Sequence, residues 1–463
     1  MAKNNVKPFG MRDKIGYMFG DIGNDFTFLL SSSFLMKFYT DIMGVDAAIV
    51  GIAMMVARFV DAFTDVMMGR ICDRSKMTPV GKFKPWIRRM CGPLAISSFL
   101  IYQSGLANMP MSFKIVYLIV TYILWGSIFY TSVNIPYGSM ASAISGDPDD
   151  RQSLSTFRTI GGSLAGVVLG AGIPMIVYDH VDGVAILNGG KFTIVAGICS
   201  ALAIVCYMIC YTFTTERVKP DVDLSTSGQQ ENVLVMLKKA LTNRSLISVI
   251  AASIALLLAQ LTIQGMANYV YPNYYGNTTA QSVSMITMLV GMLISGALAK
   301  PLAAKFGKAE VGAVASALAA IVCIILLALR PENVWVYVAI QMVNWIGLGM
   351  YSMVSWALIG DVIDATELQK GIREDGSVYA LYSFARKLGQ AASSGLTGSL
   401  LAMVGYSAAT AFDTKVVNGI YNIACIIPAI GFLALALILW FWYPLHKKQV
   451  DANVAALKMK HGE

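Results

Sequence analysis

Three charged side chains, those of Arg58, Asp61 and Asp65, lie in a segment that is otherwise apolar and long enough to cross a bilayer. An ionised side chain at the centre of a membrane costs at least about 2.5–3.5 kcal/mol on insertion scales, so these groups need partners. Spacings of three and four residues place them on one face of a helix, with Thr64 at its edge. This face offers oxygen ligands for a cation. The alternative is an inert Arg–Asp ion pair that holds helices together.

The composition is that of a polytopic membrane protein. Of the 463 residues, 56% are hydrophobic and only 13% are charged. Apolar windows of about 20 residues recur twelve times along the chain. Such segments must be helices, because a backbone in contact with lipid has to satisfy its own hydrogen bonds. The predicted fold class is therefore all-α, with twelve transmembrane helices.

The basic residues follow membrane topology. Most of the 35 lysines and arginines fall between spans on one side, which the positive-inside rule identifies as cytoplasmic. We expect a multi-pass protein of the cell membrane with both termini in the cytoplasm, and the net charge of +8 does not indicate nucleic-acid binding. The seven cysteines and three histidines show no metal-ligand spacing, and no nucleophile–base pair is visible. Neither a cofactor nor an enzymatic activity is predicted.

The chain divides into two similar parts. The longest polar stretch between spans, 214–244, separates a half of six spans (1–213) from a second half of six spans (245–443). A tail, 444–463, follows on the predicted cytoplasmic side. Two six-helix halves joined by a central loop describe the major facilitator architecture, in which substrate binds between the halves near the bilayer midplane. Polar residues within spans are therefore the candidates for binding.

In the first half, several polar side chains suit a sugar. Asp25 lies deep in span one beside an aromatic residue, and a carboxylate can accept two hydrogen bonds from vicinal hydroxyl groups. Asp21, one turn earlier, is expected to be a helix-end charge, and Lys37 is expected to extend its ammonium group outward. Span four contributes Tyr130 and Asn134. For Asn134 alone, packing between helices is an equal alternative to contact with a ligand.

Arg158, at the start of span five, could hold a carboxylate of the protein or of an acidic sugar, or could serve as a positive-inside anchor. In span eleven, Lys387 needs an anion, and Asp61 and Asp65 are the obvious partners. If Lys387 faces them, binding of a cation or of protons would reorganise the pairing and so link the ion to the sugar site.

Four charged residues near the end of span ten are predicted to form a gate. Asp361, Asp364 and Glu367 end the span, and Arg373 lies in the next loop. Salt bridges there could close the cytoplasmic side in one state and break in the other. A solvated loop without a gating role is the alternative.

Combined motifs of the chain resemble one transporter family, the glycoside-pentoside-hexuronide:cation symporters of the melibiose-permease-like branch. The matching segments are Arg58-Phe-Val-Asp61-Ala-Phe-Thr-Asp65, Gly81-Lys-Phe-Lys-Pro-Trp86, Asn134-Ile-Pro-Tyr137, Gly371-Ile-Arg373 and Arg386-Lys387-Leu-Gly-Gln390. The resemblance implies that Asp61 and Asp65 are ligands of the coupling cation, with Thr131 nearby and Lys387 adjoining both sites. It further implies sugar-binding positions at Asp25 and Arg158, and cavity positions at Tyr130, Asn134 and Ser383.

Two positions depart from the melibiose permeases. Thr64 stands where those permeases have an asparagine in the cation site, which leaves an oxygen but no amide. The identity of the coupling ion therefore stays open between sodium and a proton. If it is sodium, Asp61 and Asp65 would be metal ligands. Asn134 and Gly138 stand where those permeases have an aspartate followed by a tryptophan. This argues against an α-galactoside and allows a hexuronide, a xyloside or a glucoside.

These observations predict a secondary active symporter, working by alternating access, that imports a glycoside, pentoside or hexuronide with H⁺ or Na⁺. The expected partners are the sugar, a monovalent cation or proton and the lipid bilayer, with the monomer as the functional unit. The alternative is a protein of the same fold that transports lipid, or a sugar sensor that does not transport.

Overall fold

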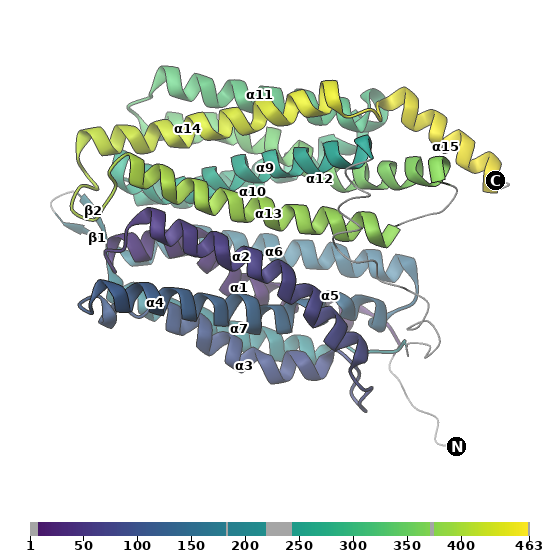
Figure 1. Cartoon of the computed structure of the whole chain (residues 1–463), viewed down its shortest axis with the longest axis horizontal. Helices are drawn as coiled ribbons and strands as arrows, with labels where there is room; N and C mark the ends of the chain where they lie inside the picture. Colours follow the sequence, from purple (N-terminus) through teal and green to yellow (C-terminus); the bar gives the residue numbers. More distant parts are fainter. Residues whose placement is uncertain (1–7, 182–183, 219–242, 371–374, 462–463) are drawn as a thin grey trace. The chain divides into compact units, whose positions relative to one another are not determined.

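The computed structural model describes residues 8–181, 184–218, 243–370 and 375–461 (Figure 1). These residues are almost entirely helical, in agreement with the predicted all-α class. The helices of the first part are α1 (Met11–Asp41), α2 (Ala47–Arg74), α3 (Lys84–Ile101), α4 (Met111–Ile123), α5 (Thr131–Ile144), α6 (Pro148–Val177) and α7 (Gly189–Phe213). Those of the second part are α9 (Arg244–Tyr269), α10 (Thr278–Phe306), α11 (Lys308–Leu329), α12 (Val334–Lys370), α13 (Asp375–Met403), α14 (Thr414–Leu437) and α15 (Lys447–His461).

Three π-helical segments and one short 3₁₀ turn interrupt or extend these helices. The π segments are η2 (Leu124–Tyr130), which joins α4 to α5, η3 (Val270–Tyr274) after α9, and η4 (Ile438–Trp442) after α14. The 3₁₀ turn η1 is Ser104–Leu106. A π segment inside a long helix is often found at a functional site, because the widened turn redirects its side chains.

The chain forms two compact units. Unit 1 consists of residues 1–229 together with 406–409, and unit 2 consists of residues 230–405 and 410–463. The boundary between them lies within the polar stretch 214–244. Within that stretch, residues 232–241 are apolar and basic at helical spacing, which predicts a short helix on the cytoplasmic surface. These residues lie outside the described part of the chain.

In unit 1, α1 packs along α6 and α7, α3 packs on α7 and α5, and α2 contacts α4, η2 and α5. Fully buried aromatic side chains fill the interior, among them Tyr102, Trp125 and Tyr207. A short hairpin that the apolar pattern did not predict follows α6: β1 (Tyr178–Val181) pairs antiparallel with β2 (Val184–Leu187). The side chain of Asp179 in β1 accepts a hydrogen bond from Asn188, 2.6 Å away, which ties the hairpin to the start of α7.

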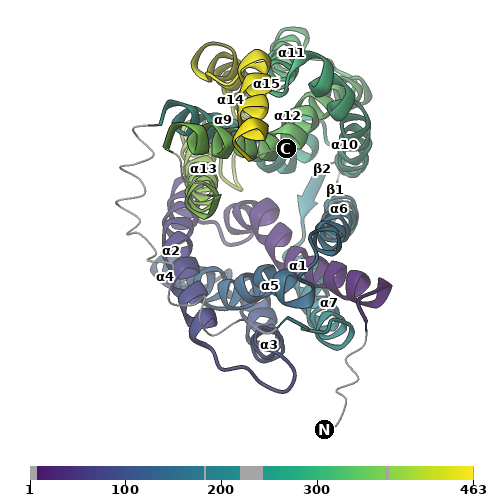
Figure 2. The same ribbon diagram turned by 90° about the vertical axis from the view of Figure 1, so that its right-hand side faces the viewer.

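In unit 2, α9 packs against both α13 and α14, while α12 packs against α10 and α11 (Figure 2). The core contains Trp345, Tyr351 and Phe432. The C-terminal tail forms α15, which lies against α12 near the end of the chain (Figure 1). The tail that the sequence analysis placed at 444–463 is therefore packed on unit 2.

Within the described residues, nine helices are long and apolar enough to span a membrane. The long helices α1, α3 and α13 fall outside this set, because they contain more charged or polar residues. Large apolar side chains lie exposed on the outer surface, as lipid contact requires; Phe63 is 67% exposed and Leu293 is 66% exposed. The fold is that of an all-α, multi-pass membrane protein.

The expectation for Lys37 was wrong. Its side chain is only 2% exposed, and the ammonium group pairs with Asp41 at 2.8 Å and donates a hydrogen bond to the Tyr406 hydroxyl at 2.7 Å. The pair spans one helical turn of α1, so both charges are neutralised within unit 1. A buried acceptor removes the need for the long side chain to reach water.

Candidate functional site

Arg58 and Asp61 form a buried ion pair on α2. Arg58 Nη1 lies 3.1 Å from Asp61 Oδ2, and the two residues are 7% and 5% exposed. The guanidinium group also lies over the rings of Phe28, Tyr122 and Trp125, at 5.0, 5.9 and 5.9 Å. Such cation–π contacts further stabilise a cation that has been removed from water.

The second oxygen of Asp61 is held by a residue that the sequence analysis did not select. Ser127, in the π segment η2, donates a hydrogen bond of 2.5 Å to Asp61 Oδ1. Both oxygens of this carboxylate therefore have partners in unit 1. The available sequence signal was weak: Ser127 precedes Thr131 by four residues in a span that already carried several polar groups.

Asp65 lies one turn further along α2 and meets the same span. Thr131 Oγ1 donates a hydrogen bond of 2.8 Å to Asp65 Oδ1. Thr64 Oγ1 instead donates to the backbone carbonyl of Asp61, at 3.2 Å, so its proton is engaged within its own helix. The structure thus brings together the predicted residues Asp61, Asp65 and Thr131, with Thr64 on the adjoining surface of α2.

A second cluster of charges joins α1 to α6. Arg158 Nε lies 2.8 Å from Asp21 Oδ1 and pairs with it. A Cβ atom added at Gly162 would lie 3.0 Å from an oxygen of Asp21 and 3.0 Å from an oxygen of Asp25, so both carboxylates reach the same point beside α6. We call Asp21 and Asp25 the acidic pair. Asp21 therefore belongs to this cluster and is not the solvated helix-end charge that its position suggested.

Asp25 is the member of the acidic pair that is best placed to receive a ligand. Its side chain is half-buried, and it makes no hydrogen bond with the described residues. Asp21, in contrast, is neutralised by Arg158, whose side chain is 41% exposed. A polar, partly accessible surface with one uncommitted carboxylate can accept hydrogen bonds from the hydroxyl groups of a ligand.

Aromatic and amide side chains lie around these two clusters. The ring of Tyr130, in η2, stacks on Phe28 of α1 with a centroid distance of 5.6 Å. Asn134 Oδ1 accepts a long hydrogen bond of 3.4 Å from Asn24 Nδ2, and Asn24 Oδ1 accepts one of 2.7 Å from the Tyr207 hydroxyl. Asn134 thus contributes to packing between helices of unit 1 while its side chain stays partly exposed.

The remaining predicted binding residues belong to unit 2. Lys387 lies half-buried on α13, and Ser383 lies on the same helix with its side chain outside the described residues. The expected pairing of Lys387 with Asp61 and Asp65 joins the two units, and it stays a prediction.

The predicted gate residues lie on α12 or beyond its end. Asp361 pairs with Lys308 of α11, with 2.5 Å between Oδ1 and Nζ, and Asp361 is 6% exposed. Glu367 is buried and Asp364 is half-buried, whereas Arg373 lies outside the described residues. One gate residue is thus placed in an ion pair within unit 2, and the gating role stays a prediction.

The donor set around α2 suits a hard monovalent ion or a proton. The carboxylates of Asp61 and Asp65 and the hydroxyl groups of Ser127 and Thr131 are all oxygen ligands. Among the described residues, no group of three or more His, Cys, Asp or Glu side chains could hold a metal ion. Oxygen ligands of this kind suit a hard cation, whereas transition metals favour nitrogen or sulfur ligands.

Long apolar helices in two compact units, each with buried charged side chains, are typical of a multi-pass membrane transporter. The family model described as MFS/sugar transport protein matches residues 16–447, and the chain belongs to this family of the major facilitator superfamily. The resemblance that the combined sequence motifs indicated is confirmed. The family consists of transporters, so the protein is not an enzyme.

Curated relatives cover nearly the whole chain. The glucuronide carrier protein homolog of Escherichia coli (strain K12) is 30% identical over 448 residues, which are 96% of this chain and 95% of the relative. The isoprimeverose transporter of Lactiplantibacillus pentosus is 29% identical over 467 residues, which are 99% of this chain and 93% of the relative. Among solved structures, a D-xylose-proton symporter superposes with a TM-score of 0.62 at 15% identity, covering 94% of this chain and 96% of that chain. This last likeness shows the fold alone.

Proposed function

We propose that the protein is a secondary active symporter that imports a glycoside, pentoside or hexuronide together with H⁺ or Na⁺. One observation carries the proposal: unit 1 holds two adjacent polar clusters inside apolar helices. The cluster of Asp61, Asp65, Ser127 and Thr131 offers ion ligands, and the acidic pair with Arg158 offers sugar ligands. Charges in spans carry an insertion penalty, and they persist where transport needs them.

The sugar class is supported by chemistry and by kinship. Asp25 supplies an acceptor for vicinal hydroxyl groups, and the half-buried ring of Tyr130 supplies an apolar face for the C–H side of a sugar. Relatives of similar length are named as a glucuronide carrier homolog and an isoprimeverose transporter. A polar cluster of this kind favours a sugar over a lipid as the transported substrate.

Coupling would arise because the two clusters share helices. The acidic pair lies on α1, whose Phe28 contacts both Arg58 and Tyr130. Tyr130 immediately precedes Thr131, which bonds Asp65. An ion that reorders Asp65 and Thr131 therefore acts on the helix segment that carries Tyr130. If the bound ion raises the affinity for the sugar, linkage requires that the bound sugar raises the affinity for the ion by the same factor.

We further propose alternating access of a monomer in the cell membrane with both termini cytoplasmic. The distribution of basic residues supports the orientation. Asp361, Asp364, Glu367 and Arg373 would then gate the cytoplasmic side, and Lys387 would adjoin the ion and sugar sites.

The experiment is uptake of labelled sugars by proteoliposomes, with sodium and proton gradients imposed separately. We expect Asp65→Asn to abolish accumulation against a gradient while it retains sugar exchange, because exchange needs no net ion movement. The matched control is Asp46→Asn on the same helix: Asp46 is exposed and caps the N-terminus of α2, and asparagine is an equally good cap.

Uphill transport by Asp65→Asn at the level of the control would refute the ion role. Sugar binding by the unaltered protein without any translocation would instead indicate a sensor. Selective movement of a labelled lipid under the same gradients would indicate a lipid transporter.

A further inference from the structure

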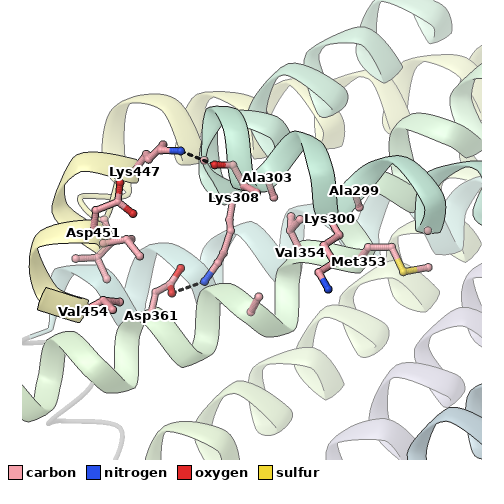
Figure 3. A pocket seen from close by; sticks show the side chains of 16 residues that line it. Ala299, Lys300, Ala303, Lys308, Met353, Val354, Asp361, Lys447, Asp451 and Val454 are labelled. Atoms are coloured by element: carbon pink, nitrogen blue, oxygen red, sulfur yellow. Dashed lines mark hydrogen bonds and ion pairs between the residues drawn. The ribbon is translucent and has the colours of Figure 1, made fainter. Parts of the chain in front are cut away.

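Unit 2 contains a pocket to which no role has been assigned. It has a volume of about 630 Å³ and lies between α10, α12 and the tail helix α15 (Figure 3). The loop between α10 and α11 borders it, and the positive-inside rule predicts that this loop is cytoplasmic. The pocket therefore lies at the predicted cytoplasmic end of unit 2.

The inner wall of the pocket is an apolar strip of small residues. Gly296, Ala299 and Ala303 recur at spacings of three and four along α10, so they share one face and extend it by about 10 Å along the helix. A Cβ atom added at Gly296 would meet no atom within 4 Å, which shows that this end is open. A narrow apolar strip that runs parallel to a transmembrane helix suits a hydrocarbon chain.

The rim of the pocket carries three lysines. Lys308 is neutralised by Asp361, and Lys447 donates to the backbone carbonyl of Ala304 (Figure 3). Lys447 also donates to the backbone carbonyl of Lys305. Lys300 is exposed and makes no hydrogen bond or ion pair with the described part of the chain. An exposed aspartate, Asp451 of α15, also lines the rim, so three ammonium groups face two carboxylates and leave a net positive charge.

One polar atom in the lining lacks a partner. Asp361 is 6% exposed, and its Oδ2 atom is buried without a hydrogen bond to any described residue, while Oδ1 pairs with Lys308. Lys308 is therefore committed to this buried carboxylate, and Lys300 and Lys447 are the ammonium groups left to a ligand.

The predicted cytoplasmic end of unit 2 carries exposed aromatic side chains of the kind found at a membrane interface. Phe306, at the end of α10, is 53% exposed, and Trp440 and Trp442 of η4 are 49% and 38% exposed. Aromatic side chains of this kind gather at the level of lipid headgroups. Helix α15 presents exposed Val454 and Met459 beside its lysines, a pattern typical of a helix at a membrane surface.

We propose that this pocket binds an anionic phospholipid, of the phosphatidylglycerol type, from the cytoplasmic leaflet. Lys300 and Lys447 would contact the phosphate, and one acyl chain would lie along the strip at Gly296. Basic pockets between helices on this side of a membrane bind anionic headgroups in the same way. The charge of the rim, the apolar strip and the interfacial aromatics each point to lipid as the occupant.

The test is native mass spectrometry of the full-length protein in detergent, with phosphatidylglycerol or phosphatidylcholine added in equal amounts. We expect selective retention of phosphatidylglycerol, and a loss of about fivefold in its affinity for Lys300→Gln, since one lysine near an anionic lipid contributes about that factor. Lys305→Gln is the matched control, because Lys305 lies on the same helix and its side chain does not line the pocket. Gly296→Leu should exclude the acyl chain without a clash, since the space at this position is open.

Equal binding of phosphatidylglycerol and phosphatidylcholine would overturn the proposal. So would an equal loss of affinity for phosphatidylglycerol in Lys300→Gln and Lys305→Gln. Displacement of the lipid by millimolar inorganic phosphate or glycerol phosphate, with no effect of Gly296→Leu, would show a site for a soluble anion and would also overturn it. Sugar uptake is measured separately, so failure of lipid binding leaves the proposed symport untouched, and failure of symport leaves the lipid site untouched.

Discussion

Its buried pair with Arg58 gives Asp61 a structural role besides its place in the proposed ion cluster, and a test can separate this structural role from ion binding by Asp65. Both oxygens of Asp61 are engaged, one by Arg58 at 3.1 Å and one by Ser127 at 2.5 Å. We expect Asp61→Asn to destabilise the protein strongly, and Asp65→Asn to destabilise it little while it abolishes coupling.

The expected magnitudes follow from what each substitution leaves behind. Asp61→Asn leaves the guanidinium group of Arg58 buried without a counter-charge, and breaking a buried pair in this way costs about 3–5 kcal/mol. Asp65→Asn keeps an oxygen that can accept the hydrogen bond from Thr131, so the free energy of unfolding should fall by no more than about 1.5 kcal/mol. A double variant, Arg58→Met with Asp61→Asn, removes both charges and should recover much of the stability.

The seven cysteines make the measurement direct. All seven are buried and none forms a disulfide bond, so a thiol-reactive fluorophore reports unfolding as each variant is heated in detergent. We expect the apparent melting temperature to fall in the order unaltered protein, Asp65→Asn, double variant, Asp61→Asn. Sugar uptake by the same preparations gives the coupling.

Equal melting temperatures for Asp61→Asn and Asp65→Asn would refute this reasoning. So would a double variant that is no more stable than Asp61→Asn, because the destabilisation would then not come from the unpaired arginine.

Two further predictions concern small residues. Gly162→Ala should weaken sugar affinity about tenfold, because the added methyl group lies 3.0 Å from both carboxylates of the acidic pair. Sugar binding measured at a saturating ion concentration checks this. Gly166→Ala is the control and should behave like the unaltered protein, because its added methyl group would have its nearest neighbour 3.9 Å away. Ser127→Ala removes the hydrogen bond to Asp61 and should raise the half-saturating concentration of the coupling ion by about 10- to 100-fold, as loss of a hydrogen bond to a charged group implies. Ser132→Ala is its control, because that hydroxyl donates to the backbone carbonyl of Ile128 and to the Met68 sulfur instead of a carboxylate. Similar ion dependence in the two serine variants would contradict the assignment.

The sequence by itself determined the class of the protein and the location of its costly charges. Apolar windows of membrane length must become helices. A charged residue inside such a window carries an insertion penalty, and it can be recognised from its neighbours in the sequence alone. Arg58, Asp61 and Asp65 could therefore be selected before any contact was known. The combined motifs indicated the family, which the family model confirmed over residues 16–447.

Only the tertiary structure decided which partner each charge receives. Ser127 and Asp61 are 66 positions apart, and Arg158 and Asp21 are 137 apart, so their meeting depends on the rotation and axial shift of whole helices. The 3.6-residue period fixes which residues share a face, but it does not fix which helix that face meets. For the same reason the sequence could not reveal the burial of Lys37, the space at Gly162 that admits the acidic pair, or the pocket that the tail helix completes on unit 2.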